Sequence, residues 1–469
     1  MRAFDAERVA AVTGATLLQP RRADAGAGPL GVSIDSRTVA PGELFVGLPG
    51  SRVDGGAHAA AALQRGAWGV LVGAQHANGL APSAHEGAED AEGTGPVVLA
   101  HRDPLLALQA LAAAWREELA AGGAKVVAIT GSTGKTSTKD ILAALLGAHL
   151  RTFASPENLN TEIGVPLAIL AAPADTQALV LEMAMRGAGQ IGELTAIATP
   201  DVGVIVNVGP AHLELLGSLS AVAAAKAELI AGLAAGATIV VPAGEPLLEA
   251  HLRADLHTVS FGEGGDVVLE EVPRDGAVGV RHGGERLVIE PSFTGAHNMR
   301  NLLAAVAAAQ ALGVRHEGPL EVRFSALRGE RRTLPGGVLL IDDCYNANPM
   351  SMRAAIDELA ETVASRRVAV LGDMLELGAD SARFHREIGA YAAQRGVELL
   401  VTVGPLAEVM REGFDGELHP VPDAQAAAEL LRGLLRTGDA VLVKGSRGVG
   451  LELVGEALAP ALEAAPGRR

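Results

Sequence analysis

The feature that most constrains the fold is the segment Thr130-Gly131-Ser132-Thr133-Gly134-Lys135-Thr136-Ser137, which directly follows a β-branched run at residues 126–130. A buried strand, a glycine turn and a Lys-Thr pair before helix-favouring residues form a phosphate-binding arrangement. Glycines let backbone N–H groups face phosphate oxygens, and the helix N-terminus adds positive charge. Lys135 would supply a point charge, and Thr136 a ligand to Mg²⁺. Because Ile129 stands where the strict pattern has glycine, we interpret the loop as a shortened variant.

Strand-like runs alternate with alanine-rich helical stretches along the rest of the chain. The runs lie at 178–182, 202–208, 238–241, 338–341, 368–371, 399–403 and 440–443. This alternation predicts an α/β protein with parallel sheets between helices, and 469 residues allow about three domains. We expect an N-terminal α/β domain at 1–100, ending in a polar surface loop at 75–95. A central doubly wound domain at 101–313 and a C-terminal Rossmann-like α/β domain at 314–469 would follow.

Composition excludes several classes of function. The chain has 38 Lys and Arg against 55 Asp and Glu, which gives a formal net charge of −17. This charge argues against non-specific electrostatic binding of nucleic acid or anionic lipid. Cys344 is the only cysteine, so we expect a reducing compartment, the cytoplasm. The N-terminus is charged where a signal peptide is apolar, and no apolar run approaches the ~20 residues of a membrane span. These observations argue against a nucleic-acid partner and a membrane span. We also expect small-molecule substrates and a monomer, which composition alone does not decide.

Polar residues near strand ends are candidates for metal binding. Glu182 ends the run at 178–182, and His212 follows the run at 202–208. The carboxyl ends of parallel strands converge on a ligand crevice, so both side chains could reach a metal beside the phosphates. Taken alone, a strand-end Glu can also be a solvated rim residue, and a loop His can satisfy a local hydrogen bond. Lys226, in the helix expected at 220–235, is by itself typical of an exposed helix lysine.

Two further segments are candidates for nucleotide binding. His297, Asn298 and Asn301 fall at the start of an expected helix, where amides either cap the helix or hydrogen-bond a purine. Asp342 and Asp343 end the strand expected at 338–341, where a carboxylate can accept ribose hydroxyls.

Together these segments resemble the Mur ligases, ATP-dependent amide-forming enzymes that build the peptide stem of peptidoglycan. The resemblance covers essentially the whole chain and rests on residues 130–136, 158–166 and 295–301. One branch of the family is matched more narrowly, by residues 342–349 with Ser351 and Met352, by 371–378, by His385 and by 444–447. The substrates of that branch are UDP-N-acetylmuramoyl-tripeptide and D-alanyl-D-alanine. Residues 35–37 and 47–55 resemble the uridine-nucleotide site of the family.

The resemblance implies a role for each matching residue. The ATP phosphates would be held by Gly131, Ser132, Thr133, Gly134, Lys135, Thr136 and Ser137, and the rest of the nucleotide by Asn298, Asn301, Arg328 and Asp343. Mg²⁺ would be held by Thr136, Glu182, His212 and Lys226, and Lys226 would act as a carbamate formed with CO₂. The catalytic residues would be Lys135, Glu182, His212 and Lys226. The other substrates would be met by Ser36, Arg37, Asn160, Thr161, Tyr345, Asn346 and Asn348.

Some alternatives stay open at this point. Arg331 and Arg332 lie close to Arg328, so any of the three could meet the nucleotide, and Gly56 stands where family members often have His. Another Mur ligase, or an amide ligase resembling folylpolyglutamate synthetase, would share the scaffold. A non-catalytic nucleotide-binding scaffold would keep the phosphate loop, but the joint presence of Glu182, His212 and Lys226 disfavours it.

Overall fold

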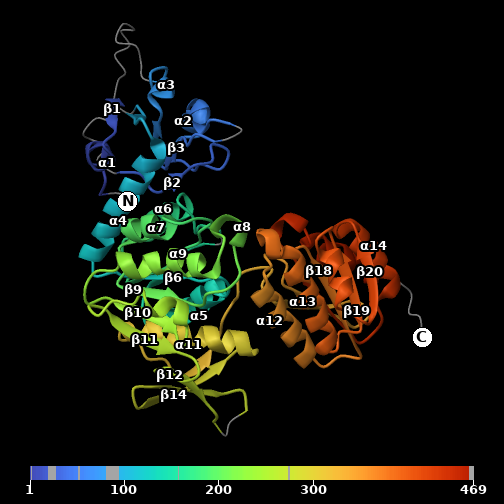
Figure 1. Ribbon diagram of the computed structural model, residues 1–469. Helices are drawn as coiled ribbons and strands as arrows, with labels where there is room; N and C mark the ends of the chain where they lie inside the picture. The colour runs from blue at the N-terminus through green and yellow to red at the C-terminus, as the bar shows by residue number, and fades with distance from the viewer. Residues whose placement is uncertain are drawn as a thin grey trace.

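The computed structural model describes residues 1, 3–19, 28–50, 53–80, 95–156, 158–272 and 275–463. It contains three sheets in chain order, each with helices packed against it, so an N-terminal, a central and a C-terminal domain can be followed in Figure 1. The α/β class predicted from the sequence is confirmed. Most of the polar stretch expected as a loop at 75–95 lies outside the described residues; its first residues belong to helix α3 (Ala74–Ala77) and the turn after it.

The N-terminal domain has a five-stranded sheet in the order β1-β5-β4-β3-β2, parallel except for β1. Its strands are β1 (Thr16–Gln19), β2 (Val32–Ser33), β3 (Leu44–Val46), β4 (Gly69–Val72) and β5 (Val97–Ala100). Its helices are α1 (Ala6–Thr13), η2 (Gly55–His58), α2 (Ala59–Gln64) and α3. Helix α4 (Pro104–Ala121) joins this domain to the next, since Trp115 packs edge-on against Phe4 of the N-terminal domain with ring centroids 5.6 Å apart.

The central sheet has ten strands in the order β15-β14-β13-β12-β11-β10-β9-β6-β8-β7. They are β6 (Lys125–Thr130), β7 (Thr152–Ala154), β8 (Ala178–Glu182), β9 (Val202–Ile205), β10 (Thr238–Pro242), β11 (His257–Phe261), β12 (Val267–Glu270), β13 (Val278–His282), β14 (Glu285–Pro291) and β15 (Gly318–Leu320). The parallel part was predicted, whereas the antiparallel pairs β12–β13 and β13–β14 were not. The strand expected at 202–208 ends at Ile205.

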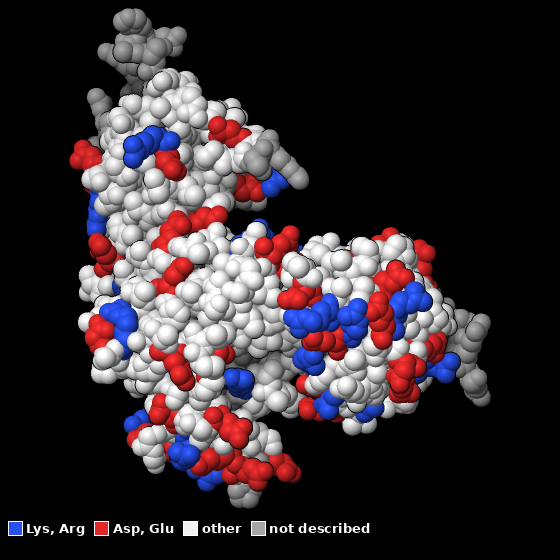
Figure 2. Space-filling model, viewed as in Figure 1, with Lys and Arg blue, Asp and Glu red and all other residues white. Residues whose placement is uncertain are grey.

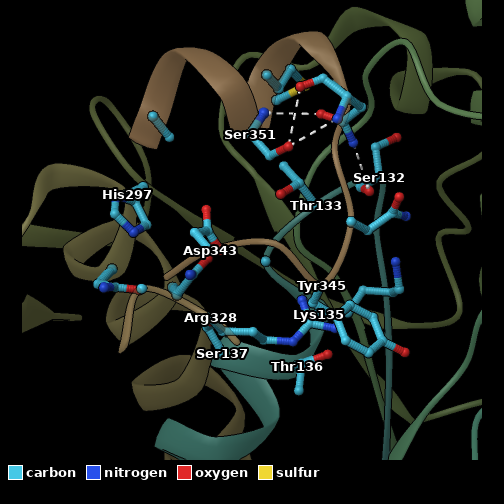
Figure 3. Close-up of a pocket in the computed structure, with 18 of the residues that line it drawn as sticks. Ser132, Thr133, Lys135, Thr136, Ser137, His297, Arg328, Asp343, Tyr345 and Ser351 are labelled. Carbon is cyan, nitrogen blue, oxygen red and sulfur yellow. Dashed lines mark hydrogen bonds between the residues drawn. The ribbon is translucent and has the colours of Figure 1, made fainter. Parts of the chain in front are cut away.

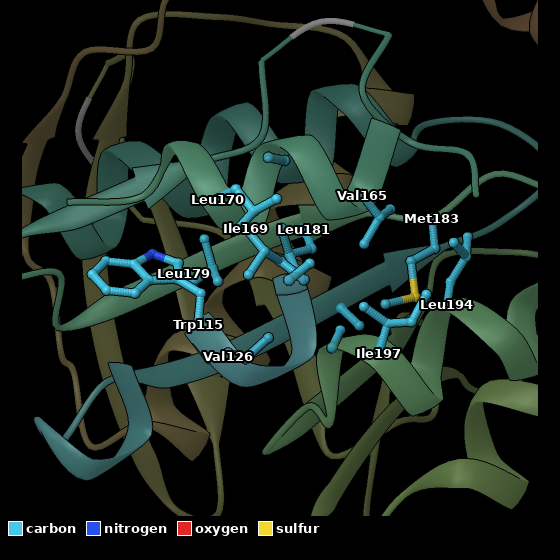
Figure 4. Close-up of a cluster of buried hydrophobic side chains, with 14 of the residues drawn as sticks. Trp115, Val126, Val165, Ile169, Leu170, Leu179, Leu181, Met183, Leu194 and Ile197 are labelled. Carbon is cyan, nitrogen blue, oxygen red and sulfur yellow. The ribbon is translucent and has the colours of Figure 1, made fainter. Parts of the chain in front are cut away.

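Helices cover both faces of the central sheet because side chains of a strand point alternately to opposite sides. Val126 and Ala128 of β6 face one core, with α4, α6 (Gly164–Ala171), α7 (Gln190–Ala198) and α9 (Leu219–Gly232) (Figure 4). Val127 and Ile129 face the other core, with α5 (Lys135–Gly147) and α11 (Ala296–Ala311). The short helices α8 (Leu213–Leu216) and α10 (Pro246–Glu249) complete the domain.

The C-terminal sheet has six strands in the order β16-β17-β21-β18-β19-β20, parallel except for β16. They are β16 (Glu330–Leu334), β17 (Val338–Asp342), β18 (Arg366–Gly372), β19 (Leu399–Val403), β20 (Glu417–Val421) and β21 (Asp439–Lys444). The helices are α12 (Pro349–Glu361), η3 (Gly378–Asp380), α13 (Ser381–Gln394), η4 (Ala407–Glu412), α14 (Ala424–Leu434), η5 (Arg447–Val449) and α15 (Glu452–Glu463).

The strand order fixes where ligands can bind. After β6 the chain first builds β7 and β8 on one side and then β9 on the other, so the loops after β6, β8 and β9 meet at a switch point of the sheet. In the C-terminal domain β21 lies between β17 and β18, which brings the loops after β17 and β21 together.

The surface carries charges of both signs. On the face shown in Figure 2, acidic and basic side chains are interspersed over the C-terminal domain. Within the described residues, no helix combines the length and the apolar character needed to cross a bilayer.

Candidate active site

A cavity of about 1110 Å³ lies between the central and C-terminal domains. It is lined by residues that follow β6, β8 and β9, by the start of α11, and by the loop between β17 and α12. Figure 3 labels Lys135 after β6, His297 in α11, and Asp343 and Tyr345 in the β17–α12 loop. Of the residues predicted to form the site, those lining the cavity are Ser132, Thr133, Gly134, Lys135, Thr136, Ser137, Asn160, Thr161, Glu182, His212, Asn298, Asn301, Arg328, Asp343, Tyr345, Asn346 and Asn348. Gly131, Ser36, Arg37 and Lys226 are not in its lining.

The phosphate loop, residues 131–134, connects β6 to α5 as the sequence predicts. Gly134 has φ 76°, a left-handed conformation that favours glycine, and a Cβ there would lie 2.6 Å from Oδ1 of Asn301. Position 134 therefore requires glycine for two reasons, the left-handed backbone and the close approach of Asn301. The Nζ of Lys135 donates to the carbonyl of Gly131 at 2.9 Å, so the lysine lies along the inside of the loop.

Asn207, which sequence reasoning missed, holds the phosphate loop from the side. Its Oδ1 accepts from the backbone N–H of Ser132 at 3.1 Å and of Thr133 at 3.0 Å, and its Nδ2 donates to the carbonyl of Thr133 at 3.0 Å. The apolar pattern places Asn207 inside a strand at 202–208, whereas β9 ends at Ile205 and Asn207 lies in the loop that follows. A polar amide directly after the apolar run 202–206 was the available signal.

Glu182 accepts two hydrogen bonds at the end of β8. Its Oε2 accepts from the Thr136 hydroxyl at 2.6 Å, and its Oε1 accepts from Nδ2 of Asn160 at 2.9 Å. Burial by itself raises the pKa of Glu182, but the charge of Lys135 and the Thr136 hydrogen bond outweigh it and hold the pKa below its ordinary value. Glu182 is thus a buried carboxylate anion beside the phosphate loop.

His212 makes a contact between the two domains. Its Nδ1 lies 2.5 Å from Oε2 of Glu376, which follows β18 in the C-terminal domain, and Nε of Arg186 lies 4.0 Å from the same carboxylate. Burial lowers the pKa of His212, and Glu376 offsets that effect only in part. Within the described parts of the chain, no three His, Cys, Asp or Glu side chains are grouped so that they could hold a metal ion.

Lys226 is buried, which rules out the alternative of an exposed helix lysine. Its side chain is 2% exposed, and it makes no hydrogen bond or ion pair with any other described residue. Burial, followed by repulsion from Lys135, lowers the pKa of Lys226 well below its ordinary value of 10.5. Alanines occupy several faces of α9, so the sequence shows no clear apolar stripe, and only packing against the sheet reveals which face is buried.

The amides at the start of α11 do not cap the helix. Gly295 is the residue before the helix, and among the described residues no side chain caps the helix there. Asn301 is buried against Gly134, and Asn298 donates to the carbonyl of Thr294 at 3.4 Å. Both amides line the cavity, which favours a ligand over the capping alternative.

The loop between β17 and α12, residues 343–348, brings the C-terminal domain to the phosphate loop. Tyr345 donates a hydrogen bond from its hydroxyl to Oδ1 of Asn158 in the central domain. Asn348 caps α12 in a reciprocal pair with Ser351 and donates from Nδ2 to the carbonyl of Ser132 at 3.4 Å (Figure 3).

The three candidate arginines differ in their partners. Arg328 lines the cavity, with its guanidinium 4.1 Å from the ring centre of Tyr345. Arg331 also lines the cavity but lies 3.1 Å from Glu358, whereas Arg332 lies 3.1 Å from Asp342 and is not in the lining. Arg328 is therefore the best placed of the three for a ligand.

Ser36 and Arg37 lie in the N-terminal domain. The Arg37 side chain is 85% exposed and pairs with Asp35 at 2.7 Å, a contact that lowers the pKa of Asp35 to about 2. Gly56 stands where the family often has His, and the imidazole of His76 packs against it. A Cβ at Gly56 would be 2.3 Å from Cδ2 of His76. The Nε2 of His76 lies 2.7 Å from Asp54, so the fold places a histidine beside this glycine.

Comparison with known proteins matches three family models along the chain. They are described as the Mur ligase family catalytic domain at residues 30–116, the Mur ligase middle domain at 129–309, and the Mur ligase glutamate ligase domain at 327–447.

Similar proteins share most of their length with this chain. The UDP-N-acetylmuramoyl-tripeptide--D-alanyl-D-alanine ligase of Mycobacterium tuberculosis is 38% identical, with 91% of each chain covered. The same enzyme of Bacillus subtilis is 35% identical, covering 90% of this chain and 91% of its own. Among solved structures, MurF from Acinetobacter baumannii is similar with a TM-score of 0.81 and 29% identity, covering 97% of this chain and 98% of its own. MurF from Thermotoga maritima in complex with ADP has a TM-score of 0.76 and 30% identity, covering 92% and 97%.

Proposed function

The chain belongs to the Mur ligase family, and we propose that it joins D-alanyl-D-alanine to UDP-N-acetylmuramoyl-tripeptide with conversion of ATP to ADP and phosphate. The observation that carries this proposal is the cavity in which the phosphate loop and Glu182 face the β17–α12 loop of another domain. Relatives that carry this activity in their names match about nine-tenths of the chain. The buried single cysteine fits the cytoplasm, which we propose as the compartment.

The reaction requires alignment and charge neutralisation more than covalent help from the protein. The terminal carboxylate of the tripeptide attacks the γ-phosphorus of ATP, the bond to the leaving ADP oxygen breaks, and an acyl phosphate forms. The amine of D-alanyl-D-alanine then attacks the acyl carbon, loses a proton and displaces phosphate. Lys135 offsets charge on the transferring group, and closure between the domains brings the amine to the acyl phosphate.

The residues present fit Mg²⁺ and a carbamate. Glu182 is a buried anion hydrogen-bonded to Thr136, two oxygen donors of the kind that Mg²⁺ prefers. Lys226 is buried without an acidic partner among the described residues, an environment that favours the neutral amine, the form that adds CO₂. Thr136, Glu182, His212 and the carbamate of Lys226 would hold the metal. Bound Mg²⁺ supplies positive charge that offsets the phosphoryl oxygens.

The proposal is tested by incubating the protein with ATP and UDP-N-acetylmuramoyl-tripeptide, with and without D-alanyl-D-alanine. Phosphate release and the mass of the product are measured. We expect sustained phosphate release only with both substrates, and a product heavier than the tripeptide substrate by one dipeptide less water. Turnover with L-glutamate and a folate, and none with the dipeptide, would show instead a folylpolyglutamate synthetase-like ligase.

A further inference from the structure

Lys444 ends strand β21 and is buried beside the candidate site. Strand β21 pairs in parallel with β17, so Lys444 lies next to Asp343, the first residue after β17. Its Nζ lies 2.6 Å from Oδ2 of Asp343, 3.2 Å from the Asp343 carbonyl and 3.0 Å from the Asn346 carbonyl. The Lys444 side chain is 2% exposed. One ammonium group thus uses its three N–H donors on a single short loop.

These hydrogen bonds set the course of the β17–α12 loop. The chain from Asp343 to Asn346 folds around the ammonium, because two of its carbonyls and one carboxylate converge on it. Tyr345, between the two anchored residues, lines the cavity, stacks against Arg328 and reaches Asn158. Lys444, which itself lines the cavity, therefore holds in place the loop that contacts the central domain.

We propose that Lys444 is a positioning residue for the ligase reaction, which orients Asp343 and the β17–α12 loop and thereby sets the affinity for the adenine nucleotide and for the amine substrate. Without the ammonium, the Asp343 carboxylate would add an unbalanced negative charge to a cavity that receives anionic phosphates. The two loop carbonyls would also lose their donor, and the loop would relax. The part that concerns the amine substrate rests on the proposed function; the part that concerns the nucleotide does not.

The alternative is that Lys444 only stabilises its domain, and the same strand offers a matched control. At the other end of β21, Asp439 pairs with Arg366 at 2.7 Å, with both side chains largely buried. Arg366 also donates to the Leu434 carbonyl at 2.7 Å, and neither Arg366 nor Asp439 lines the cavity. Loss of this ion pair should destabilise the domain without reaching the site.

The experiment compares Lys444→Met and Arg366→Met in the full chain. The Kd for ADP is measured by titration calorimetry, and KM is measured for each substrate. Hydrogen bonds to charged groups commonly correspond to tenfold or greater effects, so Lys444→Met should weaken ADP binding by about tenfold. We expect KM for D-alanyl-D-alanine to rise with it, and KM for the UDP-linked substrate to stay within about twofold. Arg366→Met should lower the melting temperature and leave the ADP Kd of the folded protein unchanged.

An unchanged ADP Kd in folded Lys444→Met, or an equal change in Arg366→Met, would overturn the proposal. If Lys444→Met does not fold, Lys444→Arg is measured instead. A planar guanidinium keeps the charge but cannot direct three N–H groups at the same acceptors, so ADP binding should again weaken, and an unchanged Kd would again refute the positioning role. If the wild-type protein fails to use the dipeptide, the proposed function fails, while the ADP titrations still decide the role of Lys444.

Discussion

Replacing Lys226 with methionine should abolish turnover and yet stabilise the protein. Lys226 is buried in α9 without a hydrogen-bond or ion-pair partner among the described residues. Lys139 of α5 provides the matched control, because it is also buried but donates to the carbonyl of Ser155 at 3.0 Å and lies 3.2 Å from Asp140. Methionine has a similar length and no charge. Lys226→Met therefore removes an amine without a hydrogen-bond partner among the described residues, whereas Lys139→Met removes an amine that is hydrogen-bonded and ion-paired.

The size and the pH dependence follow from the lowered pKa of Lys226. A buried site that disfavours the ammonium form of Lys226 costs free energy relative to the solvated lysine of the unfolded state, and we take about 2 kcal/mol as a lower value. For a domain of about 150–250 residues, that corresponds to a rise in melting temperature of roughly 4–8 °C. Because the pKa is lower in the folded than in the unfolded state, the unfolded wild type binds more protons, and wild-type stability rises with pH. The advantage of Lys226→Met is therefore full below the folded-state pKa and fades as the pH rises toward the ordinary value of 10.5.

The assay is thermal unfolding of the three proteins in CO₂-depleted buffer at pH 6.5 and pH 9.5, with phosphate release measured in parallel. We expect Lys226→Met to melt above the wild type, by more at the lower pH, and Lys139→Met to melt below it. Bicarbonate should raise wild-type activity and leave Lys226→Met inactive. A Lys226→Met protein that melts at or below the wild type at both pH values, or that keeps its activity, would refute the reasoning.

Three further predictions concern other parts of the site. If Lys135 offsets charge on the transferring phosphoryl group, as we propose, Lys135→Ala should lower kcat by about 100-fold or more in steady-state assays; wild-type turnover would contradict this. Arg37→Ala should raise KM for the UDP-linked substrate and not for ATP in steady-state assays, since Arg37 lies in the N-terminal domain; the opposite pattern would reassign that domain. Gly209→Ala should lower kcat/KM because its Cβ would lie 1.8 Å from the Sδ of Met350 across the domain boundary, and adding Met350→Ala should restore the loss. A double variant no better than Gly209→Ala would show that this contact does not limit catalysis.

Much of the fold followed from local sequence patterns. The run at 126–130 became β6, with Val126 facing one core and Val127 the other, and residues 178–182 became β8 without change. Such segments are predictable because a strand with apolar side chains on both of its faces is buried on both sides only inside a sheet that lies between helices. The antiparallel strands β12–β14 were not predicted, since their half-exposed residues give a weaker apolar signal.

The parts of the site that depend on chemistry within a few residues could be predicted from the sequence. Gly134 and Lys135 between a buried strand and a helix predict a phosphate loop, because backbone conformation and a helix terminus are local properties. The distant side chains that surround this loop are brought to it by the tertiary fold. Asn207 hydrogen-bonds to it, Lys226 is buried with no hydrogen-bond or ion-pair partner in the described part of the chain, and Lys444 anchors the facing loop. In the sequence each of the three is an ordinary amide or lysine. The physical reason is that burial and partnership depend on strand order and domain contact, which join residues hundreds of positions apart and leave no periodic signal in the chain.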